Sequence, residues 1–211
     1  MIVVDTEFTH LNFKGGLWQI GALELENPTN TFLEEARLEE EDEIQQAALN
    51  VVGKTEEELR SKKRQSQKQM LEHFFKWAEK IKIKNIICHG QWDFSYILIK
   101  ADKFGLEFPF PHRAFDLHGI AQTKHMEIKG EFLIKENKSW MGLDFVLGFC
   151  GILDERRRAD TKTGLLIKQG SPHNALEDVK LEAECFSRLI YGRNLLPEFA
   201  KFKIPEYLLK C

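Results

Sequence analysis

The sequence predicts an α/β fold in which a mixed sheet is flanked by helices within a single domain. Two observations lead to this fold class. Short runs of β-branched and apolar residues alternate along the chain with longer segments of helical periodicity. The length of 211 residues also suits one domain, which can bury roughly 70% of the surface of its unfolded chain.

The first half of the chain supplies two adjacent strands and then two helices. Residues 2–4 and 17–25 have the composition of strands, and the Gly-Gly turn before the second one predicts an antiparallel hairpin. A short helix is expected at 55–60 and a longer one at 65–81. The apolar face of the longer helix is typical of core packing rather than of a base-stacking platform. This face consists of Met70, Phe74, Trp77, Ala78 and Ile81.

The second half of the chain continues the alternation and adds a tail. The expected elements are a buried strand at 86–88, a helix at 94–104, a strand or sheet edge at 114–118, a helix at 139–149 with Ser139 as its N-cap, a loop at 154–172 and a helix at 173–191. We therefore expect one domain at residues 1–191 and a C-terminal extension at residues 192–211 that packs on it.

Composition indicates a soluble cytoplasmic protein. Hydrophobic residues make up 43% of the chain and charged residues 30%, which is ordinary for a globular domain. No apolar run approaches the length of about 20 residues that a membrane span needs, and the N-terminus does not resemble a signal peptide. The net charge of −3 argues mildly against wrapping of long duplex nucleic acid. Seven acids in residues 34–43 predict a solvated helix or loop.

The four cysteines do not form a metal-binding or disulfide pattern. They contain no CxxC pair, and three of them lie within apolar segments. We expect reduced core thiols and one terminal thiol rather than a zinc site or a disulfide framework. They are Cys88, Cys150, Cys185 and Cys211.

Asp5 and Glu7 stand two positions apart where the first strand run stops. Because side chains alternate along a strand, both carboxylates point to the same face of the sheet. Ligands of α/β proteins collect at strand ends, and an isolated charge at the end of a buried strand is costly. A single pair of this kind is more often a pair of surface acids, so it needs support from elsewhere in the chain.

Asp93 and the segment from His173 to Asp178 provide that support. Asp93 follows a buried strand and a glycine at the start of a helix, where a simple N-terminal cap explains it equally well. His173 and Asp178 are five positions apart. If His173 lies in the loop before the last helix and Asp178 lies in its second turn, both side chains can lean toward one point. Pro172 supports a helix start at this place.

Together these segments predict a metal centre. Each close pair of carboxylates costs about 4 kcal/mol at an effective dielectric constant of about 20, so a gathered set needs cations. Oxygen ligands select hard ions, and hence Mg²⁺ or Mn²⁺ rather than Zn²⁺. Two such ions about 3.5–4 Å apart can hold the attacking and leaving oxygens of a phosphoryl displacement. A histidine beside them is a suitable base for the attacking water.

The segments VVDTEFT, HGQWDFSYI and HNALEDVKLEAE resemble, in order and spacing, the three motifs of the DEDDh exonucleases, the DnaQ-like 3′→5′ exonucleases. The resemblance spans about residues 2–190 and includes the segments WQIGALEL and SWMGLDFVLGFCGI. It implies a ribonuclease-H-like fold, with a mixed five-stranded sheet flanked by helices. One departure is that Gln91 and Trp92 precede Asp93, where the family commonly has a small residue or Asn. This departure leaves the substrate contacts at that place open.

The resemblance also implies roles for individual residues. The ligands of two Mg²⁺ or Mn²⁺ ions would be Asp5, Glu7, Asp93 and Asp178, and the general base would be His173. The residues after Glu7 would contact the terminal nucleotide, namely Phe8, Thr9 and Leu11. Packing of Phe8 beneath the site is an equally good interpretation. The arginines at 156–158 precede His173 and either hold the phosphates of the incoming strand or are simply solvated.

The function implied is a 3′→5′ exonuclease that releases nucleoside 5′-monophosphates from the free 3′ end of single-stranded RNA or DNA, with RNA slightly preferred. One alternative is a catalytically silent member of the same fold that binds nucleic acid or a partner protein. Another is a metal-dependent phosphatase or endonuclease. Many members of the family form homodimers, which is a further alternative for this chain.

Overall fold

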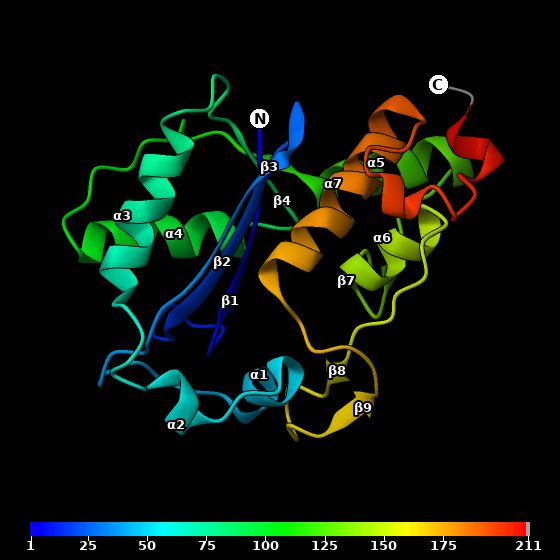
Figure 1. Ribbon diagram of the computed structural model, residues 1–211. Helices are drawn as coiled ribbons and strands as arrows, with labels where there is room; N and C mark the ends of the chain where they lie inside the picture. Colours follow the sequence, from blue (N-terminus) through cyan, green and yellow to red (C-terminus); the bar gives the residue numbers. More distant parts are fainter. Residues whose placement is uncertain (210–211) are drawn as a thin grey trace.

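The computed structural model describes residues 1–209 and contains a mixed five-stranded sheet with helices on both faces (Figure 1). The strands of this sheet are β1 (Ile2–Phe8), β2 (Leu17–Glu24), β3 (Asn27–Glu35), β4 (Ile86–Cys88) and β5 (Phe115–Asp116). The helices are α1 (Gln46–Val52), α2 (Glu56–Leu59), α3 (Gln67–Ala78), α4 (Trp92–Lys103), α5 (Leu117–Lys129), α6 (Leu143–Phe149) and α7 (Ala175–Tyr191). Two small ribbons, β6 (Ile134–Lys135) with β7 (Lys138–Ser139) and β8 (Arg158–Ala159) with β9 (Leu166–Lys168), and two 3₁₀ helices, Pro197–Phe199 and Glu206–Leu208, complete the chain.

The order of the strands is β3-β2-β1-β4-β5, so β1 lies at the centre of the sheet. Strand β1 pairs antiparallel with β2 and parallel with β4. The predicted antiparallel hairpin and the predicted mixed sheet are therefore confirmed. Helices α3 and α4 cover one face of the sheet, and α5, α6 and α7 cover the other (Figure 1).

The core has two main parts, one on each face of the sheet. Ile2 and Val4 of β1 pack toward α3 and α4, whereas Val3 packs toward α7. The predicted apolar face of α3 lies in the first part, where Met70 and Phe74 are fully buried. The alternation along β1 thus assigns each of its side chains to one of the two helical layers.

Strand β1 is longer than its apolar run predicts, and β3 is not predicted at all. Backbone pairing continues to Phe8, so Asp5 and Glu7, which were predicted to lie at the end of the strand, lie inside it. Strand β3 is an edge strand with mostly polar residues and Pro28 near its start, a composition that gives no strand signal. Helix α1, a seven-residue helix without a side-chain N-cap, is also absent from the prediction.

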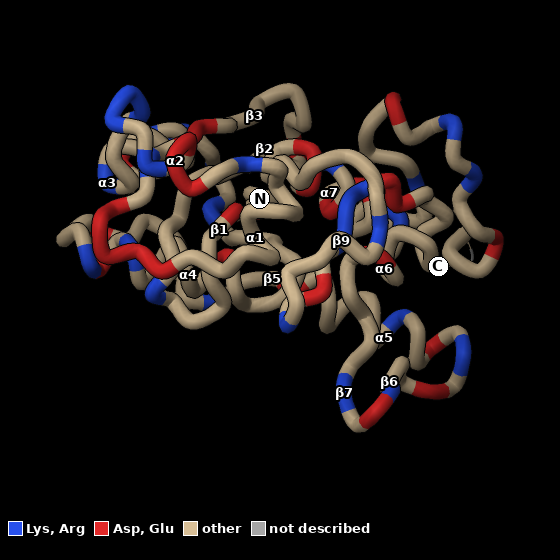
Figure 2. The backbone as a smooth tube through the Cα atoms, turned by 90° about the horizontal axis from the view of Figure 1, so that it is seen from below, with Lys and Arg blue, Asp and Glu red and all other residues tan. Residues whose placement is uncertain are grey.

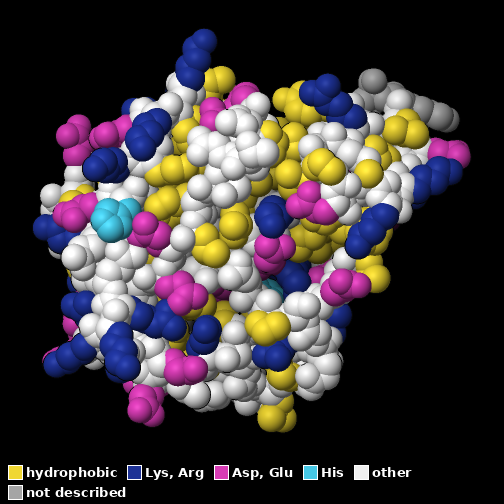
Figure 3. All heavy atoms as spheres, viewed as in Figure 1, with side chains coloured by type: hydrophobic (Ala, Val, Ile, Leu, Met, Phe, Trp, Pro, Cys, Tyr) yellow, Lys and Arg dark blue, Asp and Glu magenta, His cyan; other side chains and the backbone are white. Residues whose placement is uncertain are grey.

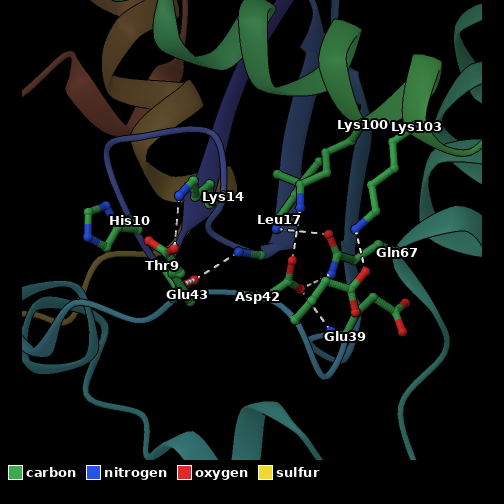
Figure 4. A network of polar contacts seen from close by, with 12 residues as sticks. Thr9, His10, Lys14, Leu17, Glu39, Asp42, Glu43, Gln67, Lys100 and Lys103 are labelled. Carbon is green, nitrogen blue, oxygen red and sulfur yellow. Dashed lines mark hydrogen bonds and ion pairs between the residues drawn. The ribbon is translucent and has the colours of Figure 1, made fainter.

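Part of the acidic segment 34–43 is buried, contrary to the expectation of a solvated helix or loop. Glu34 and Glu35 end β3, and Asp42 forms a buried ion pair with Lys100 of α4, 3.0 Å apart. Figure 4 shows Asp42 also contacting Gln67 at the start of α3. Burial of Asp42 is tolerated because these partners satisfy its carboxylate.

The segment from 114 to 149 differs from the prediction in two respects. A helix, α5, follows β5 directly and is capped by Asp116, but its sequence has only a weak apolar stripe. Helix α6 begins after Gly142 rather than at Ser139. Ser139 instead belongs to the β6–β7 ribbon, which projects from the body of the molecule in Figure 2, and its hydroxyl contacts His118 and Gln122.

The last part of the chain is tied to α7. The expected loop at 154–172 carries the β8–β9 ribbon, and α7 begins after Asn174, whose side chain caps it. Arg188 of α7 donates hydrogen bonds to the carbonyls of Phe199 and Phe202. These contacts fit the expected packing of a C-terminal extension, and the division of the chain at residue 191 stays a prediction.

Three of the cysteines, Cys88, Cys150 and Cys185, are buried free thiols, as predicted, and Cys211 lies outside the described residues. Among residues 1–209, no helix has the length and apolar character needed to cross a membrane. Acidic and basic side chains are interspersed across the face shown in Figure 3. This mixture fits the small net charge of the chain.

Candidate active site

Asp5 and Glu7 project from the centre of the sheet toward α7. They lie on the same face of β1 as Val3, which packs against α7, because side chains alternate along a strand. The side chain between them, Thr6, faces the opposite way. The predicted common orientation of the two carboxylates is therefore present in the structure.

Asp93 is held beside them by Thr6. The backbone N–H and the hydroxyl of Thr6 both donate to Oδ1 of Asp93, at 2.9 and 2.7 Å. Strand β4 lies next to β1, and Gly90, with a φ of 84°, turns the chain from β4 into α4. Asp93 lies in the first turn of α4 and is buried. Oδ1 of Asp93 is therefore bonded to Thr6 of β1, so the residue does more than lie at the start of its own helix.

Two residues of β2 let α7 approach the acids. Gly21 pairs directly with Asp5, and a Cβ at Gly21 would lie 2.2 Å from the carbonyl carbon of Ala175, so only glycine fits beneath the first turn of α7. Gln19 accepts a hydrogen bond from the N–H of Ala175 at 2.8 Å. These contacts place Asp178, in that same part of α7, over β1.

His173 lies in the loop immediately before α7. Its Nε2 lies 2.9 Å from the carbonyl oxygen of Arg157, so Nε2 carries a proton and donates it. Its Nδ1 lies 3.4 Å from Oδ2 of Asp178. The backbone N–H of His173 donates to the carbonyl of Val51 in α1, which fixes the loop. The lone pair of Nδ1 in the neutral ring therefore faces the acids.

Arg156 reaches into the same site from the segment before β8. Its Nε lies 2.9 Å from Oδ1 of Asp154, and its Nη1 lies 3.4 Å from Oδ1 of Asp178. The side chain is largely buried. Of the three consecutive arginines, Arg158 instead pairs with Asp144, and Arg157 donates to the carbonyl of Gly170. Of these three arginines, Arg156 is therefore the one that lies beside Asp178.

The four predicted acids, His173 and Phe8 line one cleft of about 270 Å³ at the end of the sheet from which α7 begins. Its lining is formed by Asp5, Thr6, Glu7, Phe8, His89, Trp92, Asp93, Leu143, Arg156, His173, Asp178 and Glu182. The four predicted acids and His173 are thus brought together. Glu182 is a fifth acid that the motifs did not indicate, although its position one helical turn after Asp178 was a usable signal.

Burial makes this site resist full ionisation. Burial raises the pKa of Asp5 and Glu7 well above ordinary carboxyl values, and the neighbouring acids raise it further. Burial also raises the pKa of Asp93 to about 6, although the hydrogen bonds from Thr6 act in the opposite direction. The pKa of Asp178 is raised by burial despite the nearby Arg156 and His173. Protons or cations are therefore needed to stabilise the cluster near neutral pH.

The two histidines of the cleft are both held in the neutral form. Burial lowers the pKa of His173, and this effect outweighs the attraction of Asp178 for its protonated form. Burial, reinforced by His118, lowers the pKa of His89 to about 4. Nε2 of His89 contacts the carbonyl of Met141 at 3.1 Å. Nδ1 of His173, the ring nitrogen that does not bond the backbone, lies 3.4 Å from Oδ2 of Asp178.

The donor set fits a divalent cation. One ligand atom from each of Glu7, His173 and Asp178 lies within 4.8 Å of the others. Oδ1 of Asp178 is buried and has no hydrogen-bond partner among the described residues, although Arg156 lies nearby. Carboxylate oxygens are the ligands that Mg²⁺ and Mn²⁺ prefer.

A second pocket opens beside Glu7 and is mostly apolar. It is lined by Glu7, Phe8, His10, Leu11, Gln45, Ala47, Ala48, Val51, Ala159 and Thr161. Phe8 borders both this pocket and the acid cleft, and its ring stacks on Tyr96 with centroids 4.2 Å apart. The hydroxyl of Thr9 is buried and bonded to the carbonyl of Glu43 and the N–H of Gly16 (Figure 4). Of the three residues predicted to contact substrate, Phe8 and Leu11 therefore line the pocket and Thr9 shapes the loop.

Comparison with solved structures identifies the fold. No protein-family description and no curated protein matches the sequence. The nuclease domain of 3′hExo, a DEDDh family member bound to rAMP, is 18% identical, with a TM-score of 0.62 over 97% of this chain and 95% of that one. A 3′-exonuclease described for 3′-end specific recognition of a histone mRNA stem-loop is 18% identical, with a TM-score of 0.63 over 92% of this chain. Exonuclease I of E. coli in complex with a dA16 oligonucleotide is 9% identical, with a TM-score of 0.57 over 90% of this chain.

The protein therefore has the ribonuclease-H-like fold of the DEDDh 3′-exonucleases, as the motifs predicted. The chain spans nearly all of the 3′hExo nuclease domain, but 64% of the stem-loop-recognising exonuclease and 40% of E. coli exonuclease I. What the chain shares with these proteins is the fold.

Proposed function

We propose that this protein is a divalent-metal-dependent 3′→5′ exonuclease that releases nucleoside 5′-monophosphates from nucleic-acid 3′ ends. The observation that carries the proposal is the convergence of four acids and His173 on one cleft of a DEDDh-type fold. These residues come from three distant segments, and their mutual repulsion is tolerable only when cations or protons neutralise it.

Four carboxylates would hold the metal ions, namely Asp5, Glu7, Asp93 and Asp178. When bound, two Mg²⁺ or Mn²⁺ ions would neutralise the charge that develops on the attacking and leaving oxygens of the phosphodiester. Thr6 orients Asp93 through two hydrogen bonds, and Gly21 sets the distance between α7 and β1. The protein thereby fixes its ligands before the substrate arrives.

His173 is the general base in this proposal. Its Nε2 proton is held by the carbonyl of Arg157, which leaves Nδ1 to take a proton from the attacking water. Burial keeps the ring neutral near pH 7, which is the form that a base requires. The segment before β8 places Arg156 at the edge of the acids.

The substrate occupies the two adjoining pockets in this proposal. The last phosphodiester lies at the acids, and the terminal nucleoside enters the apolar pocket beside Glu7, where Phe8 and Leu11 contact its base or sugar. Thr9 supports this pocket indirectly, because its hydroxyl bonds the backbone of Glu43 and Gly16. Arg156, whose guanidinium lies 3.4 Å from Oδ1 of Asp178, would contact a phosphate oxygen of the substrate.

Single-stranded RNA or DNA is the proposed substrate class. The structural neighbours include one protein bound to rAMP, one that recognises an RNA stem-loop and one bound to a DNA oligonucleotide. The proposed enzyme slightly prefers RNA over DNA. A cytoplasmic location remains a prediction from composition, and a homodimer remains an alternative.

The direct test is incubation of the protein with 3′-labelled single-stranded RNA and DNA in Mn²⁺, beside the variant Asp178→Ala. We expect stepwise release of labelled monophosphate by the wild type and none by the variant, which should keep its fold. A circular single strand should resist cleavage, because the reaction needs an end. Failure of the wild type to release monophosphate with Mg²⁺ or Mn²⁺ would favour a silent member of the fold, and cutting of the circle would favour an endonuclease.

A further inference from the structure

Glu182 is a buried acid of the cleft that has no part in the proposed reaction. It lies on α7, four positions after Asp178 and therefore on the same side of the helix. Its side chain lines the cleft, and the residue is 1% exposed. Its Oε2 has no hydrogen-bond partner among residues 1–209.

A second buried acid on the same helix shows what a purely structural role looks like. Glu184 is fully buried, but it accepts a hydrogen bond from Arg188 at 2.8 Å and two more from the backbone N–H groups of Leu195 and Leu196. Glu182 lacks such partners, and a buried carboxylate oxygen without a partner is destabilising. Its free oxygen therefore indicates a partner that binds in the cleft.

The charge of the site points to the same partner. Glu182 adds a fifth acid to a cleft whose one guanidinium, that of Arg156, already pairs with Asp154 at 2.9 Å and lies 3.4 Å from Asp178. Arg156 alone therefore cannot neutralise the five acids, whereas divalent cations in the cleft would. Burial, followed by repulsion from Asp93 and Asp178, raises the pKa of Glu182 well above its ordinary value, which a bound cation would reverse.

We infer that Glu182 is a fifth carboxylate of the metal centre and that it binds a divalent cation together with Asp93. This inference rests on the proposed metal dependence of the site. It adds one ligand, at the next turn of α7, to the set that the sequence motifs indicate. It also explains the unpaired oxygen of Glu182 in the cleft.

The test is calorimetric titration of the full chain with Mn²⁺, for the wild type, Glu182→Gln, Glu177→Gln and Asp178→Asn. Glu177 precedes Asp178 on α7 but is exposed and pairs with Lys180, so its variant is a matched control. We expect Glu182→Gln to weaken Mn²⁺ binding by about tenfold or more, and Glu177→Gln to leave it unchanged. Thermal unfolding in EDTA should show that the metal-free Gln variant is at least as stable as the wild type.

Three outcomes can be distinguished. If Glu182→Gln binds Mn²⁺ like the wild type while Asp178→Asn does not, the inference about Glu182 is wrong and the proposed metal centre stands. If Glu182→Gln loses stability in EDTA but keeps its Mn²⁺ affinity, Glu182 is only structural and the inference is also wrong. If the wild type binds no Mn²⁺, the proposed function itself fails. Should the Gln variant not fold, Glu182→Ala replaces it, and wild-type affinity in that variant would overturn the inference.

Discussion

Replacement of Asp93 by Asn should stabilise the metal-free protein while abolishing its activity. The amide oxygen of Asn can accept the same two hydrogen bonds from Thr6 that Asp93 accepts now. The variant removes a buried negative charge, and its N–H groups can donate to the neighbouring acids. The metal-free wild type should therefore be less stable than Asp93→Asn, as is common where a functional site lowers the stability of a protein.

The pKa of Asp93 gives the size and sign of the effect. In the folded protein its pKa is about 6, against an ordinary value of 3.8. Because the folded state holds this proton more tightly than the unfolded state, stability is lost as the pH rises from about 4 through about 6. A difference of about two pKa units corresponds to about 3 kcal/mol, which is the upper limit of the stabilisation expected for Asp93→Asn above pH 7.

Urea unfolding in EDTA measures this difference directly. Near pH 8 we expect the variant to have the higher free energy of unfolding, and near pH 4 we expect the two proteins to differ little. Addition of Mn²⁺ should stabilise the wild type more than the variant, because the variant has lost a ligand. A variant that is equally or less stable than the wild type in EDTA near pH 8 would refute the claim that repulsion and burial of the acids destabilise the metal-free protein.

Three further predictions concern other residues. The variant His173→Asn should lower single-turnover cleavage by about 100-fold or more with little loss of Mn²⁺ affinity. It should also remove the part of the acidic decline of the wild-type rate that comes from protonation of the ring, whose pKa burial lowers, and leave the part that comes from protonation of the acids. Gly21→Ala should weaken both stability and Mn²⁺ binding, measured by thermal unfolding and titration, because its Cβ would displace α7 from Asp5; full retention of both would contradict this packing. Lys100→Met should lower the free energy of unfolding by about 3–5 kcal/mol, since it leaves Asp42 buried and unpaired, and adding Asp42→Asn should recover much of that loss in urea unfolding.

Local sequence patterns predict the centre of the fold and most of the site. The alternation along β1 is sufficient to place Asp5 and Glu7 on one face, because strand geometry depends on adjacent residues only. The amphipathic face of α3 and the loop position of His173 are likewise local properties. Strand β3 and helix α5 were not predicted, because an edge strand needs no apolar alternation and because the stripe of α5 is weak.

The parts of the site that depend on how α7 crosses the sheet could not be predicted. Gly21 and Gln19 look like ordinary strand residues, and their importance emerges only when α7 is placed over β2. The sequence offered Arg156, Arg157 and Arg158 together as candidates, and only the structure shows that Arg156 is the one that reaches the acids. Glu182 shares a helix face with Asp178, but only the cleft shows that this face meets Asp93.

The most direct test of the central claim is an anomalous difference map from crystals of the protein grown with Mn²⁺. We predict strong Mn²⁺ peaks in the cleft, within coordination distance of the carboxylates of Asp5, Glu7, Asp93 and Asp178. A map at saturating Mn²⁺ without such peaks, with the four side chains placed as described, would contradict the claim that bound dications are what allow these acids to lie together.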